Sequence, residues 1–229
     1  MNLAIDIGNT AVKWAAFEGR TLTAHGDDVK ELADRIKQTD KVLACASGEL
    51  PNLGKQLPVL TSDTLLPIKL DYKTPQTLGA DRIADACGAW SLHRGEACLI
   101  IDAGTCITVD YLDAEGVYHG GAIMPGLNMN LQALHTFTAK LPLIDLQGVT
   151  MAPVLGRSTE ESIVAGTLGA TMLALAGYVA LYKQKNPTLH VLLTGGDAER
   201  LTAAGASGWE FAPWLTLIGL NEIIIHNEK

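Results

Sequence analysis

An acidic residue inside an apolar strand is the first place where this sequence could do chemistry. Asp6 lies in the apolar run near the N-terminus, and Gly8, Asn9 and Thr10 follow it closely. A carboxylate in such a setting is costly unless it meets a cation or hydrogen-bond donors, and Mg²⁺ that bridges phosphates is one such partner. Gly8 allows a tight turn that brings backbone N–H groups close to a phosphate, and Lys13 adds a positive charge. A plain β-turn with a hydrogen-bonded Asp6 is the alternative.

The same chemistry recurs 96 positions later in the chain. Asp102, Gly104 and Thr105 follow the apolar run Leu99–Ile101, and each copy reads as a strand, a polar turn, a second strand and a hairpin. We interpret this similarity as an ancient duplication, although two short hairpins can also resemble each other by chance. Two such turns on duplicated lobes are expected to face each other across a cleft and to hold a polyphosphate from both sides. Phosphoryl transfer depends on positioning and charge neutralisation, which this arrangement would supply.

The tetrapeptide Gly79-Ala80-Asp81-Arg82 stands at the start of a predicted helix, residues 79–93. Near a helix N-terminus Asp81 is expected to stay ionised, and an ionised carboxylate can accept a hydroxyl proton during phosphoryl transfer. Arg82 can pair with a carboxylate on a substrate. Taken alone, these residues favour a simpler interpretation, in which Asp81 caps the helix and Arg82 is solvated.

Three further segments have less specific chemistry. Thr194–Ala198 follows an apolar strand, and its small residues would let an adenine or ribose lie against the backbone. A strand-to-helix turn capped by Asp197 explains that segment equally well. The segment Gly120–Gly126 is rich in turn residues and would shape a pocket wall. Ser158 or Thr159 is expected to cap a helix.

Apolar periodicity predicts helices and strands between these motifs. Strand-and-helix alternation in each half of the chain indicates an α/β architecture. The chain is expected to break at Gly48 and Pro51. Helices are expected at 29–37, 79–93, near 129–137 and at 160–183, with a short helix opened by Gly195-Gly196-Asp197, and strands at 41–46, 67–70 and 189–193.

Composition limits the class of protein. The chain has 229 residues, of which 48% are hydrophobic and 18% charged, which is a globular composition with enough apolar material for a sizeable core. A net charge of −8 without a basic run argues against nucleic acid or an anionic membrane as the main partner. The four cysteines show no metal-ligand spacing and indicate reduced thiols. No signal peptide is expected, and the apolar run Leu168–Tyr182 is short for a membrane span, so a buried or interface helix explains it better.

Together the motifs resemble one known family, the type III pantothenate kinases. The resemblance rests on Asp6–Lys13, Gly79–Arg82, Asp102–Thr105, Gly120–Gly126, Thr159 and Thr194–Ala198, in this order, and on the C-terminal segment Leu215–Glu222. It implies a duplicated ribonuclease-H-like, actin-like ATPase fold, with lobes at 1–95 and 96–229 and an interlobe cleft for ATP. It also implies a cytoplasmic homodimer that uses ATP with Mg²⁺ to phosphorylate pantothenate, in the first step of coenzyme A biosynthesis, and that needs K⁺ or NH₄⁺.

The family's roles transfer to the residues that match its motifs. Asp81 would accept the proton of the pantothenate hydroxyl, Asp102 would bind the monovalent cation, and Thr105 would contact ATP. The helix at 160–183 would supply part of the dimer interface. The first phosphate loop would comprise Asp6, Ile7, Gly8, Asn9, Thr10, Ala11, Val12 and Lys13, and pantothenate would be held by Tyr72, Gly79, Ala80, Asp81, Arg82 and Thr159.

The chain departs from the family pattern just before Thr159, where the family often has Asn and this chain has Ser158. This difference bears on the detailed geometry of the Thr159 contact. Two other functions stay open from the residues alone. A kinase or phosphatase of the same superfamily would keep both phosphate loops without needing Gly79–Arg82. A non-catalytic nucleotide-binding regulator would not need to keep the acidic residues of all three motifs.

Overall fold

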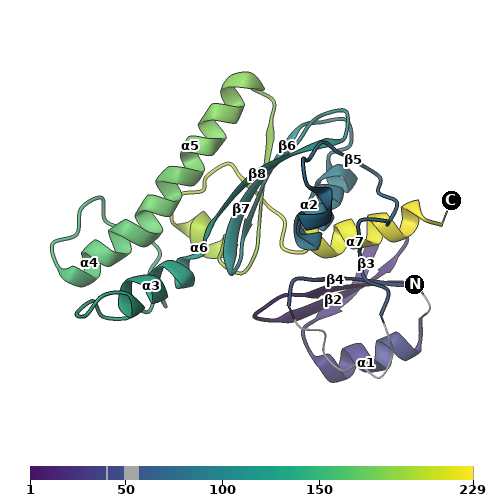
Figure 1. Ribbon diagram of the computed structural model, residues 1–229, viewed down its shortest axis with the longest axis horizontal. Coiled ribbons are helices and arrows are strands. Elements are labelled where there is room, and N and C mark those ends of the chain that lie inside the picture. Colours follow the sequence, from purple (N-terminus) through teal and green to yellow (C-terminus); the bar gives the residue numbers. More distant parts are fainter. Residues whose placement is uncertain (40, 49–56, 229) are drawn as a thin grey trace. The chain divides into compact units, whose positions relative to one another are not determined.

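The computed structural model describes residues 1–39, 41–48 and 57–228 (Figure 1). The chain forms two compact units, each built from separate stretches of sequence. The first unit comprises Met1–Ala97, Asp110–Gly120 and Trp214–Lys229, and the second comprises Cys98–Val109 and Gly121–Pro213. The predicted lobes, 1–95 and 96–229, are continuous in sequence, and their assignment as duplicated halves stays a prediction. The expected break at Pro51 lies outside the described residues.

The first unit contains a four-stranded sheet with the strand order β3-β2-β1-β4. Its central strand β1 is antiparallel to β2 and parallel to β4, so the chain must cross over between β3 and β4. Helix α1 (Val29–Lys37) makes that crossover, and the carboxylate of Asp28 caps its N-terminus by accepting from two backbone N–H groups. The strands are β1 (Asn2–Ile7), β2 (Val12–Glu18), β3 (Thr21–Gly26) and β4 (Val42–Ala46).

Helix α1 covers one face of this sheet. Successive side chains of a strand point to opposite faces, so residues 3, 5 and 7 of β1 share a face. Leu3, Ile5 and Ile7 pack with Leu32 and Ile36 of α1 in one apolar core. Burial of side chains of this size is the main favourable contribution to the stability of the unit, at roughly 1.5–3 kcal/mol each.

The opposite face of the sheet packs against the C-terminal helix α7 (Leu215–His226). Asn2, on this face, donates from Nδ2 to Asn221 Oδ1 of α7 over 2.9 Å. Helix α7 also packs along α2 (Ala80–Leu92), which follows the 3₁₀ turn Pro75–Thr77. Since Asp6 alternates with Ile5 and Ile7, it shares the sheet face of Asn2 and α7.

The second sheet has six strands in the order β10-β9-β6-β7-β8-β5. β9 is parallel to both β6 and β10, and β5 is parallel to β8. We expected Gly120–Gly126 to be a turn-rich wall, but its residues up to Pro125 belong to β8. Gly120 has a φ of +83°, a local irregularity that glycine allows inside a strand. The strands are β5 (Lys69–Leu70), β6 (Cys98–Ala103), β7 (Cys106–Leu112), β8 (Val117–Pro125), β9 (His190–Thr194) and β10 (Glu210–Phe211).

The helices of the second unit include one long, continuous helix. It begins after Ser158, whose Oγ accepts from the backbone N–H of Glu161 over 3.1 Å, which confirms the predicted cap. A π-helical turn, Ala165–Gly169, joins its two α-helical parts. The helices of this unit are α3 (Leu127–Thr136), α4 (Thr159–Val164), α5 (Ala170–Lys185) and α6 (Ala198–Ala203).

This long helix, Thr159–Lys185, has 27 residues and a hydropathy of 1.7 in its apolar window, so by length and composition it could cross a membrane. The prediction that the region is too short for a span was wrong, because it counted only the uninterrupted apolar run. The helix continues on both sides of that run. One such helix is weak support for a membrane protein, since core helices of soluble proteins meet the same test.

Candidate active site

The first predicted phosphate loop joins β1 to β2 in the first unit. The backbone N–H of Gly8 donates to the carbonyl of Ala11 over 3.0 Å, and residues 9–11 are exposed. Lys13 lies directly opposite Asp6 in the antiparallel register of the two strands. The loop therefore places three exposed residues close to one carboxylate and one ammonium group.

Asp6 is contacted by a cysteine of the neighbouring strand. Cys45 lies beside it in the parallel register of β4, and its Sγ donates to Asp6 Oδ1 over 3.2 Å. The pKa of Asp6 is raised, first by burial and then by the charge of Asp81, although the Cys45 hydrogen bond and Lys13 act in the opposite direction. Burial also raises the pKa of the Cys45 thiol well above its usual range. Cys45 therefore stays protonated and can keep donating at neutral pH.

Asp81 stands in the first turn of α2, as predicted, and its Oδ1 accepts from the backbone N–H of Arg82 over 2.8 Å. A Cβ added at Gly79 would collide with this same carboxylate oxygen, so the glycine is required for the position of Asp81. Burial is the main cause of the raised pKa of Asp6, and the charge of Asp81 adds to it. The first unit therefore contains both Asp6 and the predicted proton acceptor Asp81.

Arg82 is buried and paired inside the first unit. Its Nε lies 3.2 and 3.1 Å from the two carboxylate oxygens of Asp110, and its Nη2 lies 2.5 Å from Oδ1. The hydroxyl of Tyr118 donates to the same carboxylate over 2.7 Å, and the Arg82 guanidinium lies 6.0 Å from the ring of Tyr72. Burial alone would lower the pKa of Arg82, but Asp110 raises it overall, so the guanidinium stays charged. The contact of Arg82 with a substrate stays a prediction.

Tyr72 lies against the glycine at the start of the β8 irregularity. A Cβ at Gly120 would come within 3.0 Å of the Tyr72 ring, so only glycine leaves room for the ring without a shift. The Tyr72 and Tyr118 rings are also 6.1 Å apart, centroid to centroid. Tyr72, Arg82 and Asp81 therefore belong to one neighbourhood of the first unit, where the predicted substrate residues Gly79 and Ala80 also lie.

The second predicted phosphate loop belongs to the second unit and is tighter. The backbone N–H of Gly104 donates to the carbonyl of Cys106 over 3.0 Å, and Thr105 between them is exposed. The loop is backed by Gly126, whose N–H donates to the carbonyl of Thr105 over 3.2 Å. A Cβ at Gly126 would collide with the loop's backbone. The Gly120–Gly126 segment therefore supports the loop with its last residue.

Asp102 has its own close neighbours in the second unit. Thr194 lies beside it in the parallel register of β9. Gly195 has a φ of +95°, and a Cβ there would collide with Asp102 Oδ1 and with the backbone of Ala103. The segment Thr194–Ala198 is thus packed on the second loop, and its short helix begins after Asp197 as predicted. Its contact with an adenine or ribose stays a prediction.

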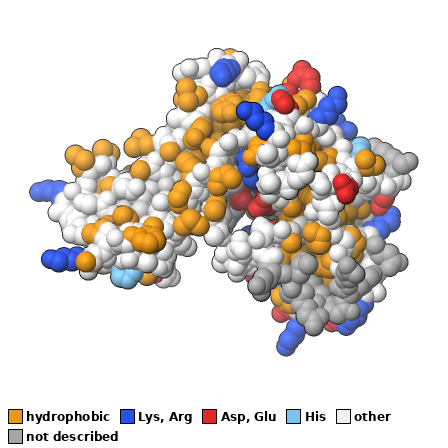
Figure 2. All heavy atoms as spheres, in the orientation of Figure 1, with side chains coloured by type: hydrophobic (Ala, Val, Ile, Leu, Met, Phe, Trp, Pro, Cys, Tyr) orange, Lys and Arg blue, Asp and Glu red, His pale blue; other side chains and the backbone are white. Residues whose placement is uncertain are grey.

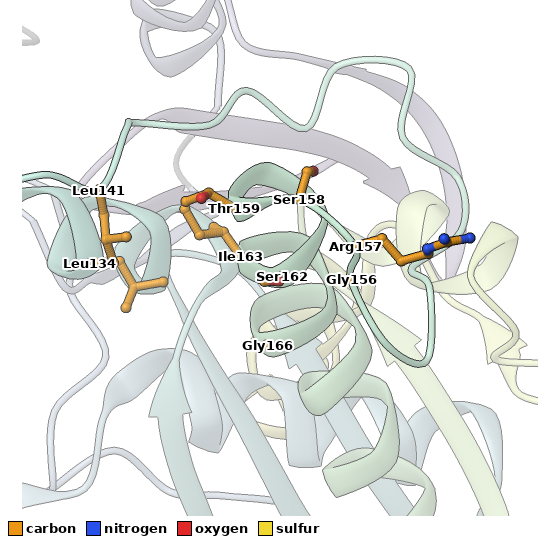
Figure 3. A pocket seen from close by; sticks show the side chains of 9 residues that line it. All are labelled: Leu134, Leu141, Gly156, Arg157, Ser158, Thr159, Ser162, Ile163 and Gly166. Atoms are coloured by element: carbon orange, nitrogen blue, oxygen red, sulfur yellow. The ribbon is translucent and has the colours of Figure 1, made fainter.

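Thr159 lies in the second unit and lines a hollow of about 750 Å³ between the ends of α3 and α4 (Figure 3). Leu134, Leu141 and Ile163 give this hollow an apolar side, while Ser158 and Ser162 add hydroxyl groups. Of the predicted pantothenate contacts, Thr159 belongs to this unit and the others belong to the first.

Sequence reasoning missed three residues near the candidate site. Asp110 is an acid in an apolar strand, so the rule that singled out Asp6 would have found it. Asp85 is buried and lies one helical turn after Asp81, a spacing that places both on one side of α2. Cys45 gave no signal in the sequence, because its contact with Asp6 depends on the register of two strands.

The sequence profile described as type III pantothenate kinase matches residues 52–181. A type III pantothenate kinase of Phocaeicola vulgatus is 38% identical over 243 residues, and the match covers 100% of both chains. This chain belongs to the type III pantothenate kinase family. The family membership predicted from the motifs is thereby confirmed.

Solved structures support the fold assignment. A conserved Campylobacter jejuni protein named as a Baf family transcriptional activator matches with a TM-score of 0.60 at 19% identity, covering 99% of this chain and 98% of that one. Component A of (R)-2-hydroxyglutaryl-CoA dehydratase from Acidaminococcus fermentans matches with a TM-score of 0.54 at 16% identity, covering 98% and 96%. At these identities the likeness concerns the fold alone, and this type III pantothenate kinase family member has the actin-like ATPase fold.

Proposed function

We propose that this chain transfers the γ-phosphoryl group of ATP to the hydroxyl of pantothenate, forming 4′-phosphopantothenate and ADP in the first step of coenzyme A biosynthesis. Membership of the type III pantothenate kinase family supports this reaction. On the structural side, it is supported by the position of Asp81 in the first turn of α2, in the same compact unit as Asp6 near the end of β1. A proton acceptor beside the acid of a phosphate loop is what phosphoryl transfer to an alcohol requires.

Asp81 is the proposed proton acceptor. Its carboxylate would take the hydroxyl proton of pantothenate while the alcohol oxygen bonds to the γ-phosphorus and the bond to the β-phosphate oxygen breaks. Gly79 and the backbone N–H of Arg82 hold this carboxylate in place. The amides of the first loop and Lys13 would bind the phosphates. Tyr72, Gly79, Ala80, Arg82 and Thr159 are the proposed pantothenate contacts, and Ile7, Ala11, Val12 and Thr105 complete the proposed contacts with ATP.

The acidic residues of the site fit the proposed cations. Burial and the negative charge of Asp81 both raise the pKa of Asp6, so its ionised form is unfavourable. A bound cation would stabilise that ionised carboxylate. Mg²⁺ prefers carboxylate and phosphate oxygens, and bound there it would neutralise phosphate charge. We assign Asp6 to the Mg²⁺–ATP site. Asp102, an oxygen ligand on the second loop, is the proposed site for K⁺ or NH₄⁺.

The variant Asp81→Asn tests the assignment of the proton acceptor. It keeps the size of the side chain and removes its basicity, so turnover should fall by about 10²–10⁴-fold while ATP still binds. The measurement is ADP release with and without pantothenate, in the presence of K⁺ or NH₄⁺, together with a nucleotide-binding assay. Near-wild-type turnover by Asp81→Asn would remove Asp81 from this role. ATP binding by the wild type without pantothenate-dependent ADP release would favour a regulator, and ADP release with other alcohols would favour a different kinase.

We also propose that the protein is a cytoplasmic homodimer and that the long helix Thr159–Lys185 contributes to its interface. Only 39% of the apolar window of this helix is buried within the chain, and Leu173 and Leu181 are 77% and 59% exposed. Figure 2 shows hydrophobic side chains at the surface in the region where Figure 1 draws α3, α4 and α5. A second copy of the chain would remove such surface from water.

The oligomeric state of a Leu173→Glu variant tests this proposal. We expect a dimer for the wild type and a monomer for the variant in sedimentation analysis without detergent, because a buried unpaired carboxylate disfavours association. A monomeric wild type would contradict the dimer. Recovery of the wild type only from membranes would contradict the cytoplasmic location.

A further inference from the structure

Helices α2 and α7 of the first unit run parallel and in register. The hydroxyl of Thr216 donates to Asp85 Oδ1 over 2.7 Å, and the hydroxyl of Ser91 contacts Glu222 Oε2 at 3.3 Å. Both pairs are separated by the same interval of 131 residues. Because the interval is the same at both contacts, the two helices run in the same direction and advance equally per residue. The position of α7 along its axis therefore defines the position of α2.

Between these two contacts the helix backbones touch. A Cβ added at Gly219 would collide with the carbonyl of Ala84 and approach the backbone N–H of Gly88. A Cβ added at Gly88 would collide with the carbonyl of Leu215. Small residues at a helix crossing allow this close approach, and the interlocked surfaces leave no room for one helix to slide along the other.

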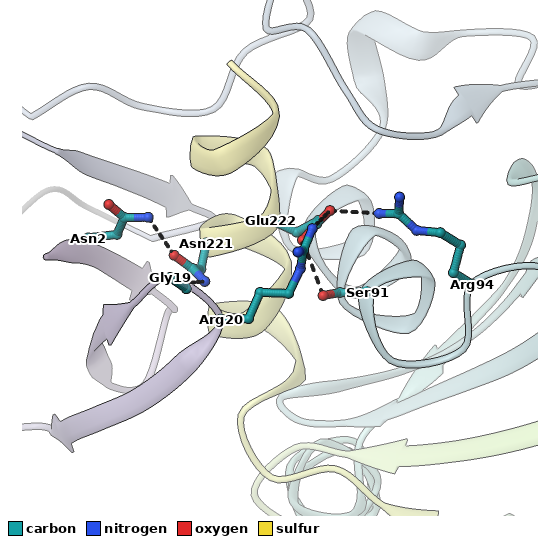
Figure 4. Close-up of polar contacts among 7 residues, drawn as sticks. All are labelled: Asn2, Gly19, Arg20, Ser91, Arg94, Asn221 and Glu222. Atoms are coloured by element: carbon teal, nitrogen blue, oxygen red, sulfur yellow. Dashed lines mark hydrogen bonds and ion pairs between the residues drawn. The ribbon is translucent and has the colours of Figure 1, made fainter. Parts of the chain in front are cut away.

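The far end of α7 is held by a buried carboxylate (Figure 4). Glu222 is only 4% exposed, and it accepts two hydrogen bonds from Arg20, at 2.8 and 2.9 Å, and one from Arg94 at 2.8 Å. Burial alone would raise the pKa of Glu222, but the two arginines and Ser91 outweigh it and lower the pKa overall. Arg20 lies in the β2–β3 hairpin, so the same carboxylate ties α7 to the strand that follows the first phosphate loop.

The near end of α7 reaches the candidate site through Thr216. Asp85, which accepts from Thr216, is only 1% exposed and lies one turn after Asp81 on the same helix. We infer that Thr216, acting through Asp85, is a positioning residue for Asp81. The inference rests on the proposed function, in which Asp81 accepts the substrate proton. In this role Thr216 does not touch the substrate. It fixes the position of the first turn of α2 along the helix axis, relative to the phosphate loop.

The size of the effect follows from the sensitivity of catalysis to position. A displacement of about 1 Å in a reacting group can cost about 100-fold in rate. Loss of the Thr216 hydroxyl also leaves the buried carboxylate of Asp85 with one donor fewer, which favours a local movement of the first turns of α2 toward other donors or water, while the Gly88 and Gly219 contacts keep the two helices in register. Since Thr216 is on a different element from the phosphate loop, the affinity for ATP should change little.

The test compares Thr216→Val, which keeps the shape but loses the donor, with Thr216→Ser, which keeps the donor. We expect Thr216→Val to lower kcat for pantothenate phosphorylation about tenfold at an unchanged KM for ATP, and Thr216→Ser to retain kcat within twofold. Ser91→Ala is the matched control, because it removes the helix–helix hydrogen bond at the end remote from Asp81. It should leave kcat within twofold even if thermal stability falls.

A second measurement does not depend on turnover. Hydrogen exchange of the backbone amides at the start of α2, residues 80–85, should be faster in Thr216→Val than in Thr216→Ser and in the wild type. If Thr216→Val fails to fold, Thr216→Ala replaces it in both measurements. Equal kcat for the donor-free variant and Thr216→Ser would overturn the inference. If the wild type shows no pantothenate-dependent ADP release, the proposed function is contradicted. In that case the inference is judged by hydrogen exchange alone, and exchange at residues 80–85 that is equal in Thr216→Val and in the wild type would overturn it.

Discussion

The two phosphate loops follow one plan in two different units. In each, the last residue but one of a strand is acidic, and a short loop leads to the adjacent strand. A parallel strand reached through a helix lies on the other side. The parallel neighbour of Asp6 is Cys45, and that of Asp102 is Thr194. The equivalence of these pairs extends the similarity of the two motifs to their surroundings.

A closely packed glycine follows the parallel strand in both units. A Cβ at Gly48 would collide with the carbonyl of Gly8, and a Cβ at Gly195 would collide with the backbone of Ala103. In both places the backbone of one loop lies directly on another, which holds the phosphate loop at the end of its strand. This detail was not expected from either motif.

The loops differ in length and charge. The first closes between Gly8 and Ala11 and carries Lys13, whereas the second closes between Gly104 and Cys106. A longer loop with a lysine suits close contact with phosphate, and a tight loop suits a fixed carboxylate. We therefore expect the two copies of the motif to have different roles, with phosphate binding in the first loop and cation binding at Asp102 in the second. Substitutions at matched positions can test this division of roles.

The largest effect is expected from the two acids themselves. Asp6→Asn should lower kcat by about 10²–10³-fold, as removal of one preorganised electrostatic group does, and should preserve or raise the melting temperature. The reason for the second effect is that the raised pKa of Asp6 makes its ionised form unfavourable for the fold at neutral pH. Asp102→Asn should instead weaken activation by K⁺ or NH₄⁺. Turnover and thermal unfolding of both variants, over a cation titration, measure this, and equal responses would argue against this division of roles.

An intermediate effect is expected from the two glycines. Gly195→Ala should destabilise the protein more than Gly48→Ala, because a non-glycine residue in the left-handed region costs about 1–2 kcal/mol in addition to the clash. Gly195 has a φ of +95°, whereas Gly48 has no positive φ. The free energy of unfolding in urea is the measurement, with Gly177→Ala in α5 as a control where an added Cβ meets open space. A larger loss for Gly48→Ala would show that the first loop is the less tolerant of the two.

The smallest effect is expected from the thiol beside Asp6. The Cys45 hydrogen bond lowers the pKa of Asp6, so Cys45→Ala should raise that pKa further. The acidic limb of the pH profile of kcat/KM for ATP should then move to higher pH, because Asp6 becomes protonated at a higher pH. Cys45→Ser, which keeps a donor, should leave the limb near its wild-type position. The matched control is Cys87→Ala, which removes a buried thiol elsewhere in the unit.

Elements with one clear apolar face were predictable from the sequence, and others were not. Helix α1 was predicted at 29–37 and lies at Val29–Lys37, because its polar and apolar faces are distinct. Helix α7 gave no such signal, since it is apolar almost all round and packs against both the sheet and α2. The second half of β8 was mistaken for a turn because its glycines and Pro125 are turn residues in most settings.

For the candidate site, local motifs predicted individual residues but not their support. Asp6 stood out because a carboxylate inside an apolar strand is costly without a partner. Asp81 stood out only as part of the Gly79–Arg82 motif, since an acidic residue at a helix start is also explained by a cap. Cys45 and Thr216 did not, because their partners lie 39 and 131 positions away along the chain. Such contacts follow from strand register and helix packing, which a single sequence without a fold does not specify.

The placement of α7 also has a consequence for synthesis on the ribosome. The strands of the first sheet are translated before the second unit, whereas the helix that covers their second face is translated after it. Until then the nascent chain exposes that face, and the phosphate loop on β1 stands on an incomplete support. A product that lacks α7 would therefore lose the cover on the second face of the first sheet, although the strands of that sheet were made before the second unit.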